Sequence, residues 1–197
     1  MATQLNRSMV SEVSICNQAL GFLGASRITS LDDPSVAANR CRDNYSFLRD
    51  AVLEERMWSF ALAREVSEVA DKAAWGDLYQ HQLPVEWMQV FRVFSDAGGH
   101  GKANWVREGE FVLADYPKVY LWGITRVTDT NKFSQLFVQA LAARLAAELA
   151  MPITNNRELQ ADMWGLYQQK LRDAATRDGQ QGSSERIQSS ALVDARR

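Results

Sequence analysis

Apolar residues recur every four positions between Phe133 and Pro152, with alanines at most of the intervening positions. A spacing of three to four residues follows one face of an α-helix, and alanine has the highest helix propensity. The segment is therefore predicted to be helical from Phe133 to Ala150, and Pro152 is expected to end the helix. Because apolar side chains cover most of its circumference, this helix should lie between other elements. The repeat consists of Phe137, Leu141, Leu145 and Leu149.

A membrane span has to be weighed for this helix, because about 20 apolar residues are enough to cross a bilayer. Arg144 and Glu148 lie one turn apart inside the segment, and charged side chains are costly in the hydrocarbon of a membrane. We therefore expect a buried core helix and no membrane span.

Three more helices are predicted, over Ser11–Leu23, Pro34–Met57 and Asn156–Arg177, because apolar residues recur in each at helical spacing. Ser11 is expected to cap the first helix. Gly24 is expected to follow its last residue, where the backbone needs a positive φ. The remaining start signals are Asp32 and Asp33 before Pro34, and Asn155 or Asn156.

The pattern changes to that of strands over residues 58–127. Trp58, Phe60 and Leu62 alternate with small residues, which predicts a half-buried strand, and residues 65–74 are interpreted as a short helix or a surface loop. Three glycines favour a flexible loop over Ser95–Ala103. Strands are expected on both sides of that loop, with turns at Glu108-Gly109 and Asp115-Tyr116-Pro117. Together these residues predict an antiparallel meander of about four strands.

The predicted fold class is mainly α with a small antiparallel β insertion (α+β), in which a four-helix bundle carries the meander. One domain is expected over residues 11–177, with the bundle formed by residues 11–57 and 133–177 and the insertion by residues 58–127. Residues 1–10 are expected to be a flexible N-terminus. Residues 178–197, rich in Gly, Gln and Ser, are expected to be a flexible tail.

Composition narrows the function classes. The chain has 197 residues, 46% of them hydrophobic, and a net charge of −2, so it can bury a core but carries no basic excess that favours nucleic-acid binding. No apolar run follows a basic start, so no signal peptide is expected. Cys16 and Cys41 are predicted to be reduced core thiols, although a disulfide between their helices stays open.

Candidate catalytic and metal-binding residues are few. The two histidines, His81 and His100, have no ligand partner at metal-binding spacing, and no phosphate-binding or nucleophile motif occurs. We therefore expect no cofactor, no metal and no enzymatic activity. The alternative is a carbohydrate hydrolase that uses Glu108 and Glu110, since a pair of carboxylates can cleave a glycosidic bond.

Tryptophan is frequent, and four of the six indoles fall in or beside the β region. Such side chains could stack on sugars or bases, but a small sheet cannot bury all of them, and tryptophan is enriched at protein interfaces. We therefore expect these residues to form a contact with another subunit or another protein. They are Trp75, Trp87, Trp105 and Trp122.

The order of these features resembles the tail tubular protein A family, the head–tail adaptors of short-tailed bacteriophages (podoviruses). The resemblance covers roughly residues 13–171. It rests on ICNQALGFLGASRITSLDD (15–33), ERMWSFALARE (55–65), LPVEWMQVFRV (83–93) and, most specifically, RVTDTNKFSQLFVQALAARLAAELAMPIT (126–154).

The resemblance implies a structural virion protein without catalytic residues. Twelve copies would form a ring between the portal and the tail nozzle, and DNA would pass through the lumen during ejection without sequence-specific binding. Tail fibres are a further candidate partner. The protein would be located in the virion tail, and in the host cytoplasm during assembly.

The tail beyond Asp178 would then dock on the portal. It cannot fold alone, but it contains apolar and basic side chains that can contact a surface. These are Arg186, Ile187, Leu192, Val193, Arg196 and Arg197.

A third interpretation is a small intracellular helical binding protein that is unrelated to phages. A coding sequence for a portal or nozzle protein beside the one for this chain would exclude that interpretation.

Overall fold

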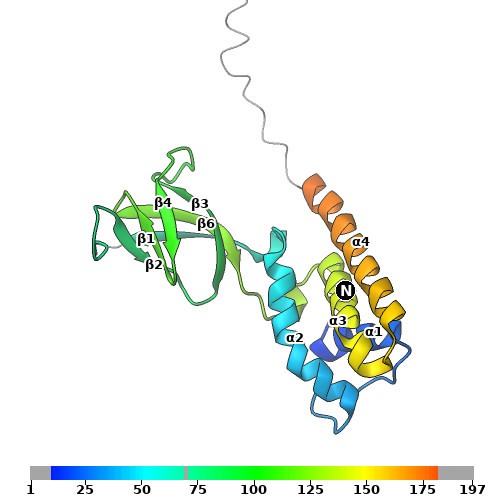
Figure 1. Ribbon diagram of the computed structural model, residues 1–197. Coiled ribbons are helices and arrows are strands. Elements are labelled where there is room, and N and C mark those ends of the chain that lie inside the picture. The colour runs from blue at the N-terminus through cyan, green and yellow to red at the C-terminus, as the bar shows by residue number, and fades with distance from the viewer. Residues whose placement is uncertain (1–9, 69–70, 182–197) are drawn as a thin grey trace, which may run out of the picture.

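The computed structural model describes residues 10–68 and 71–181, with side chains as far as Thr176. Figure 1 shows a β lobe at the left, joined to a helical lobe at the right. The helices are α1 (Glu12–Phe22), α2 (Val36–Glu54), α3 (Gln135–Thr154) and α4 (Arg157–Gln181). The strands are β1 (Leu62–Glu68), β2 (Tyr79–Gln82), β3 (Trp87–Phe94), β4 (Trp105–Glu108), β5 (Phe111–Ala114) and β6 (Lys118–Thr125). The predicted α+β class is therefore confirmed.

Helix α3 is the centre of the helical lobe, because α1, α2 and α4 all pack against it. Leu141 and Leu145 are completely buried, as predicted for the middle of the core. The prediction that Pro152 ends this helix is wrong. The helix continues to Thr154, because the N–H of Asn155, at φ 52°, bonds to the Met151 carbonyl and closes the last turn.

The predicted start of α1 is confirmed and that of α2 is wrong. The Ser11 side chain accepts a hydrogen bond from the N–H of Ser14, and Gly24 has φ 67° just beyond the helix. Helix α2 begins at Val36 and its cap is Ser35. The Asp33 carboxylate accepts hydrogen bonds from the N–H groups of the preceding loop, at Thr29 and Ser30, and so does not cap the helix.

Two helix ends also differ from the prediction. Helix α2 ends at Glu54, three residues before Met57. Helix α4 continues past Arg177 to Gln181, so its last turn belongs to the segment that was expected to be tail. Of the two expected caps of α4, Asn155 and Asn156, the structure has Asn156, whose side chain accepts a hydrogen bond from the N–H of Leu159.

Residues 58–61 do not form the predicted strand. Residues Ser59–Ala61 form a 3-10 turn, and the completely buried Trp58 donates its indole N–H to the Val52 carbonyl. The indole also packs edge-on against Phe137 of α3. The alternation at Trp58 and Phe60 therefore reflects packing against the helical core. Residues 65–68, expected to be helix or loop, belong to β1, because they pair with β6.

The described residues of the β lobe form six strands in two sheets, so the predicted meander of about four strands is wrong. The antiparallel strand orders are β1-β6-β3 and β2-β5-β4. Consecutive strands β5 and β6 lie in different sheets, because their apolar residues face a shared core between the sheets. That core contains Leu83, Trp87, Val93, Val112, Ala114, Val119 and Leu121.

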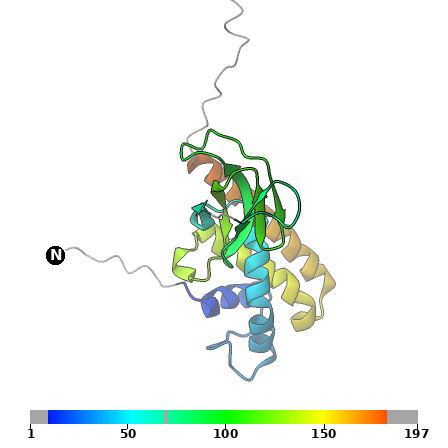
Figure 2. The same ribbon diagram turned by 90° about the vertical axis from the view of Figure 1, so that its left-hand side faces the viewer.

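Contacts near the ends of α2, β3 and β6 join the two lobes. Arg126 bonds to the Asp50 carboxylate at 2.9 Å, and the Gln89 amide donates to the Glu54 carbonyl. Ile124 and Met88 belong to the helical core although they lie on strands. Figure 2, in which the left side of Figure 1 faces the viewer, shows the strands in front of the helices.

Among the described residues, one helix, α3, is long and apolar enough to cross a membrane by length and composition. Of its most apolar window, 61% is buried inside the fold. The buried core helix of a folded domain passes the same test of length and composition.

Candidate interaction surfaces

The four tryptophans selected from the sequence do not form one cluster. The Trp75 side chain is 84% exposed, whereas Trp87 is only 6% exposed and donates its indole N–H to Glu65 at 2.8 Å. Trp105 and Trp122 are half-buried, and Trp122 stacks edge-on against Phe91. Trp87 is therefore a core residue of this chain, and Trp75 is the indole most available to a partner.

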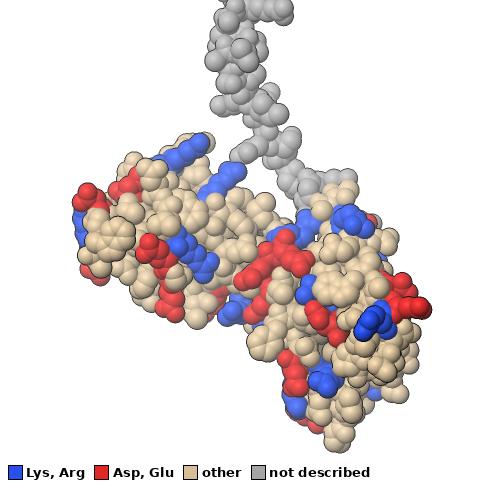
Figure 3. Space-filling view, viewed as in Figure 1, with Lys and Arg blue, Asp and Glu red and all other residues tan. Residues whose placement is uncertain are grey.

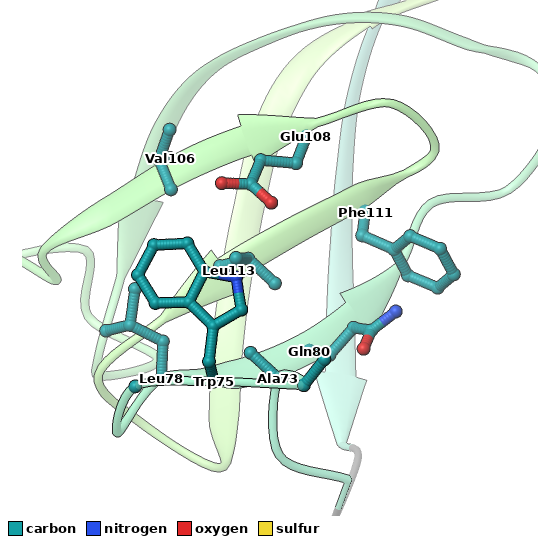
Figure 4. Close-up of a pocket in the computed structure, with 10 residues that line it drawn as sticks. Ala73, Trp75, Leu78, Gln80, Val106, Glu108, Phe111 and Leu113 are labelled. Atoms are coloured by element: carbon teal, nitrogen blue, oxygen red, sulfur yellow. The ribbon is translucent and has the colours of Figure 1, made fainter.

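Trp75 lies beside a hollow of about 350 Å³ on the outer face of the sheet β2-β5-β4. Successive side chains of a strand point to opposite faces of the sheet, so every second residue contributes to this face. Val106 and Gln80 lie on either side of Leu113, and Glu108 is paired with Phe111. Figure 4 shows the Trp75 indole and the Glu108 carboxylate directed toward this hollow above Leu113. The hollow thus combines an apolar floor, an exposed aromatic ring and one carboxylate.

The two carboxylates of the hydrolase alternative are not both in this hollow. Glu108 is one of the residues that line it, and Glu110 is not. Glu110 lies in the turn after Gly109, where its carbonyl accepts a hydrogen bond from the N–H of Leu83. A glycosidase needs two carboxyl groups on opposite sides of one bond, and the lining of this hollow contains one.

The histidines have separate environments. His81 on β2 is completely buried, with Nδ1 3.1 Å from the Ser67 hydroxyl and Nε2 2.9 Å from the Tyr116 carbonyl. Because the carbonyl can only accept, Nε2 carries the proton in this pairing. His100 is exposed in the loop after β3. Across residues 10–68 and 71–181, no group of three or more His, Cys, Asp or Glu side chains could hold a metal ion.

The loop after β3 is closed by a carboxylate. Asp96 accepts hydrogen bonds from the backbone N–H groups of His100 and Gly101. The hydrogen bond from Gly101 is the largest of the causes that hold the pKa of Asp96 below its ordinary value. Glycine provides the positive φ of 71° at Gly99 that this turn requires.

Cys16 on α1 and Cys41 on α2 are free thiols and completely buried, as the sequence predicted for core residues. Hydrogen bonding to Cys41, together with burial, raises the pKa of the Cys16 thiol. The same hydrogen bond lowers the pKa of the Cys41 thiol. Because neither side chain is exposed to solvent, both thiols serve as small apolar groups of the core.

A group of polar contacts, here called the polar seam, holds α4 against the other helices. The sequence patterns did not predict it. Arg144 of α3 bonds to Glu55 at 3.3 Å and to Glu148 at 3.1 Å, and its guanidinium lies 4.4 Å from the centre of the Trp164 ring. The Tyr167 hydroxyl donates to the Glu55 carboxylate. The Arg144–Glu148 spacing was visible in the sequence, but the contacts with Glu55, Trp164 and Tyr167 join residues far apart in the chain.

The outward face of α2 was also missed. Phe47 is 75% exposed and Val36 is 67% exposed, and Arg40 lies between them on the same face. A signal was available, since Phe47 falls outside the apolar stripe through Cys41, Tyr45, Leu48 and Val52. Val36 and Phe47 lie about three helical turns apart on this face.

Charges of both signs are interspersed over the face drawn in Figure 3, and uncharged residues cover much of it. This face therefore has no broad basic patch of the kind that holds a phosphate backbone. The predicted docking residues Arg186, Ile187, Leu192, Val193, Arg196 and Arg197 lie outside the described residues.

Comparisons with known proteins do not assign the chain to a group. No protein-family model matches it, and no curated protein matches it either.

Proposed function

We propose that this chain is a subunit of a head-to-tail adaptor ring of a short-tailed bacteriophage. In this proposal twelve copies join the portal to the tail nozzle and surround the channel through which DNA leaves the capsid. Its four helices act as one bundle, and the β lobe presents the contact surface. The sequence resemblance over residues 13–171 is the origin of the proposal.

The observation that supports it most is the exposure of the Trp75 indole beside an apolar hollow. An indole buried at an interface contributes more to binding than most side chains, whereas an exposed one adds no stability to the subunit. A ring subunit has to contact two neighbours and the proteins above and below it. Apolar residues exposed on both lobes, such as Trp75 and Phe47, suit that requirement.

The charge of the chain is compatible with a DNA channel. With a net charge of −2, the chain has no excess of basic residues to bind phosphates by counterion release. DNA could then slide past the ring without being held.

Cryo-electron microscopy of particles that contain this protein tests the proposal. Twelve copies between portal and nozzle are expected, with the channel along their common axis. A different rotational symmetry at that position, or absence of the protein from the particle, would contradict it.

The segment after Gln181 is proposed to dock on the portal, and truncation tests this. A chain ending at Gln181 should unfold at nearly the same temperature as the full chain, because no described core residue is removed. The truncated chain should attach poorly to capsids that carry a portal. Equal attachment of the two chains would show that the tail has no docking role.

The hydrolase alternative would use Glu108 beside an exposed indole, and it would still require a second carboxyl group, because Glu110 does not line the hollow. Release of reducing sugar from a capsular polysaccharide, lost in Glu108→Gln and retained in Glu110→Gln, would support it. If the full chain releases no reducing sugar, the polysaccharide tested is not its substrate.

A further inference from the structure

We propose that the outward face of α2 in one subunit occupies the hollow on the β lobe of the next subunit. In this contact Arg40 forms an ion pair with Glu108 and lies on the Trp75 indole, and Phe47 and Val36 cover the apolar floor. The inference rests on the proposed function, since it names the contact that would close the ring.

The hollow selects for a partner that is both apolar and cationic. Its floor contains Leu113 and Phe111, and its rim carries the Trp75 indole and the Glu108 carboxylate. Within the described part of the chain, the Glu108 side chain has no hydrogen-bond or ion-pair partner. A guanidinium can pair with a carboxylate and stack on an indole face at the same time, which a lysine ammonium does less well.

The outward face of α2 has the matching chemistry. Val36, Arg40 and Phe47 are spaced by four and seven residues, so they share one face of the helix. The two apolar side chains are 67% and 75% exposed. Among residues 10–68 and 71–176, the Arg40 side chain also has no ion-pair or hydrogen-bond partner. Asp43 lies on the same face, and its carboxylate is 3.8 Å from the Arg42 guanidinium. The unpaired base of Arg40, one turn from the exposed Val36, thus complements an unpaired acid beside an apolar floor.

The two surfaces lie on different lobes, α2 in the helical lobe and the hollow in the β lobe (Figure 1). A contact between two different surfaces is heterologous, so each subunit uses one surface for each neighbour. Such contacts propagate from subunit to subunit and form a closed ring when the rotation fits. A symmetric dimer would require each surface to contact itself.

Thiol-specific cross-linking with a short bismaleimide tests the pairing. Arg40→Cys and Glu108→Cys are made as separate full-length variants, mixed at high concentration and cross-linked. A dimer joining the two variants is expected, with neither variant forming dimers alone. The chain that carries both changes should give a ladder of oligomers. The native Cys16 and Cys41 are completely buried and should not react in the folded protein.

Arg64→Cys mixed with Glu108→Cys is the matched control. Arg64 is an exposed base on β1, two residues from the exposed Val66, but it lies on the β lobe. It should give no cross-link to Glu108→Cys. Cross-linking through Arg64 equal to that through Arg40 would contradict the proposal.

Charge reversal gives an independent test by sedimentation velocity of concentrated full-length protein. Arg40→Glu and Glu108→Arg should each weaken self-association by roughly tenfold or more, and the double variant should restore most of it. Absence of the Arg40–Glu108 cross-link, both in solution and in assembled particles, overturns the inference. A twelvefold ring with another contact between subunits would overturn it and leave the proposed function intact.

Discussion

The helical lobe and the β lobe reach stability in different ways. In the helical lobe one element, α3, is buried on nearly all sides and the other three helices pack on it. In the β lobe two three-stranded sheets enclose a core of seven buried residues. The first arrangement buries a large apolar core around α3, although Phe47 and Val36 of α2 stay exposed. The second buries little, and its outer face carries the Trp75 indole and the hollow.

This difference indicates that the helical core mainly stabilises the fold, whereas the outer face of the sheet is available for binding. A core of alanine and leucine tolerates little change, because neighbouring helices fill the space around it. A thin sheet has an outer face that folding does not need, so that face is free to carry binding residues. Val106 and Glu108 illustrate this, since they point outward from β4 and take no part in the core of the β lobe.

The largest expected effect comes from breaking the helical core. Leu145→Ala should lower the free energy of unfolding by about 2–5 kcal/mol, because Leu145 is completely buried in α3. Val106→Ala on the exposed sheet face is the control and should change it by under about 0.5 kcal/mol. Urea denaturation measures both. A loss below about 1 kcal/mol for Leu145→Ala would show that α3 is not the core.

Close backbone packing in the β lobe should give a smaller but clear effect. A Cβ at Gly123 of β6 would collide with the backbone oxygen of Gln89, where β3 is irregular. Gly123→Ala should therefore destabilise the chain by roughly 1–3 kcal/mol.

Gly165→Ala is its matched control. Nothing lies within 4 Å of a Cβ at Gly165, which is in the middle of α4, so this change should stabilise the protein by about 0.5–1 kcal/mol. Effects of the same sign for the two substitutions would contradict the expected close packing at β6.

The polar seam of the helical lobe should contribute less. Tyr167→Phe removes the hydroxyl that donates to Glu55, and a hydrogen bond to a charged group contributes about 1.5–3 kcal/mol at most. We expect a loss near the lower end of that range, since Glu55 keeps its ion pair with Arg144. In Tyr167→Phe/Glu55→Gln the two losses should not add, which a double-mutant cycle would detect.

The smallest effect concerns the Asp33 carboxylate before α2. Hydrogen bonds from the N–H groups of Thr29 and Ser30 lower the pKa of Asp33 below its ordinary value of 3.8. Its contribution to stability should therefore be complete above that value and decrease as the pH falls through the lowered pKa. The difference in thermal midpoint between the native chain and Asp33→Asn should shrink between pH 6 and pH 2. A difference that does not change with pH would exclude this role.

Sequence patterns identified the helices more reliably than the strands. The four-residue repeat placed α3 and its buried Leu141 and Leu145, because a helix closes its hydrogen bonds locally. The repeat at Trp58 and Phe60 was misleading, since both rings pack against Phe137, which lies more than 70 residues away in the chain. Of the candidate site residues, Trp75 is exposed as expected, but Trp87 is buried in the β lobe.

Within the described residues, the sequence by itself determined the four α-helices, the cap at Ser11 and the turn at Gly109. These features depend on side chains within a few residues of the backbone groups they satisfy. Only the tertiary structure decided that β5 and β6 separate into two sheets, that Arg144 meets Glu55 and Trp164, and that Glu108 shares a hollow with Trp75. Such pairings join distant residues, and their energy depends on which surfaces the folded chain has already buried.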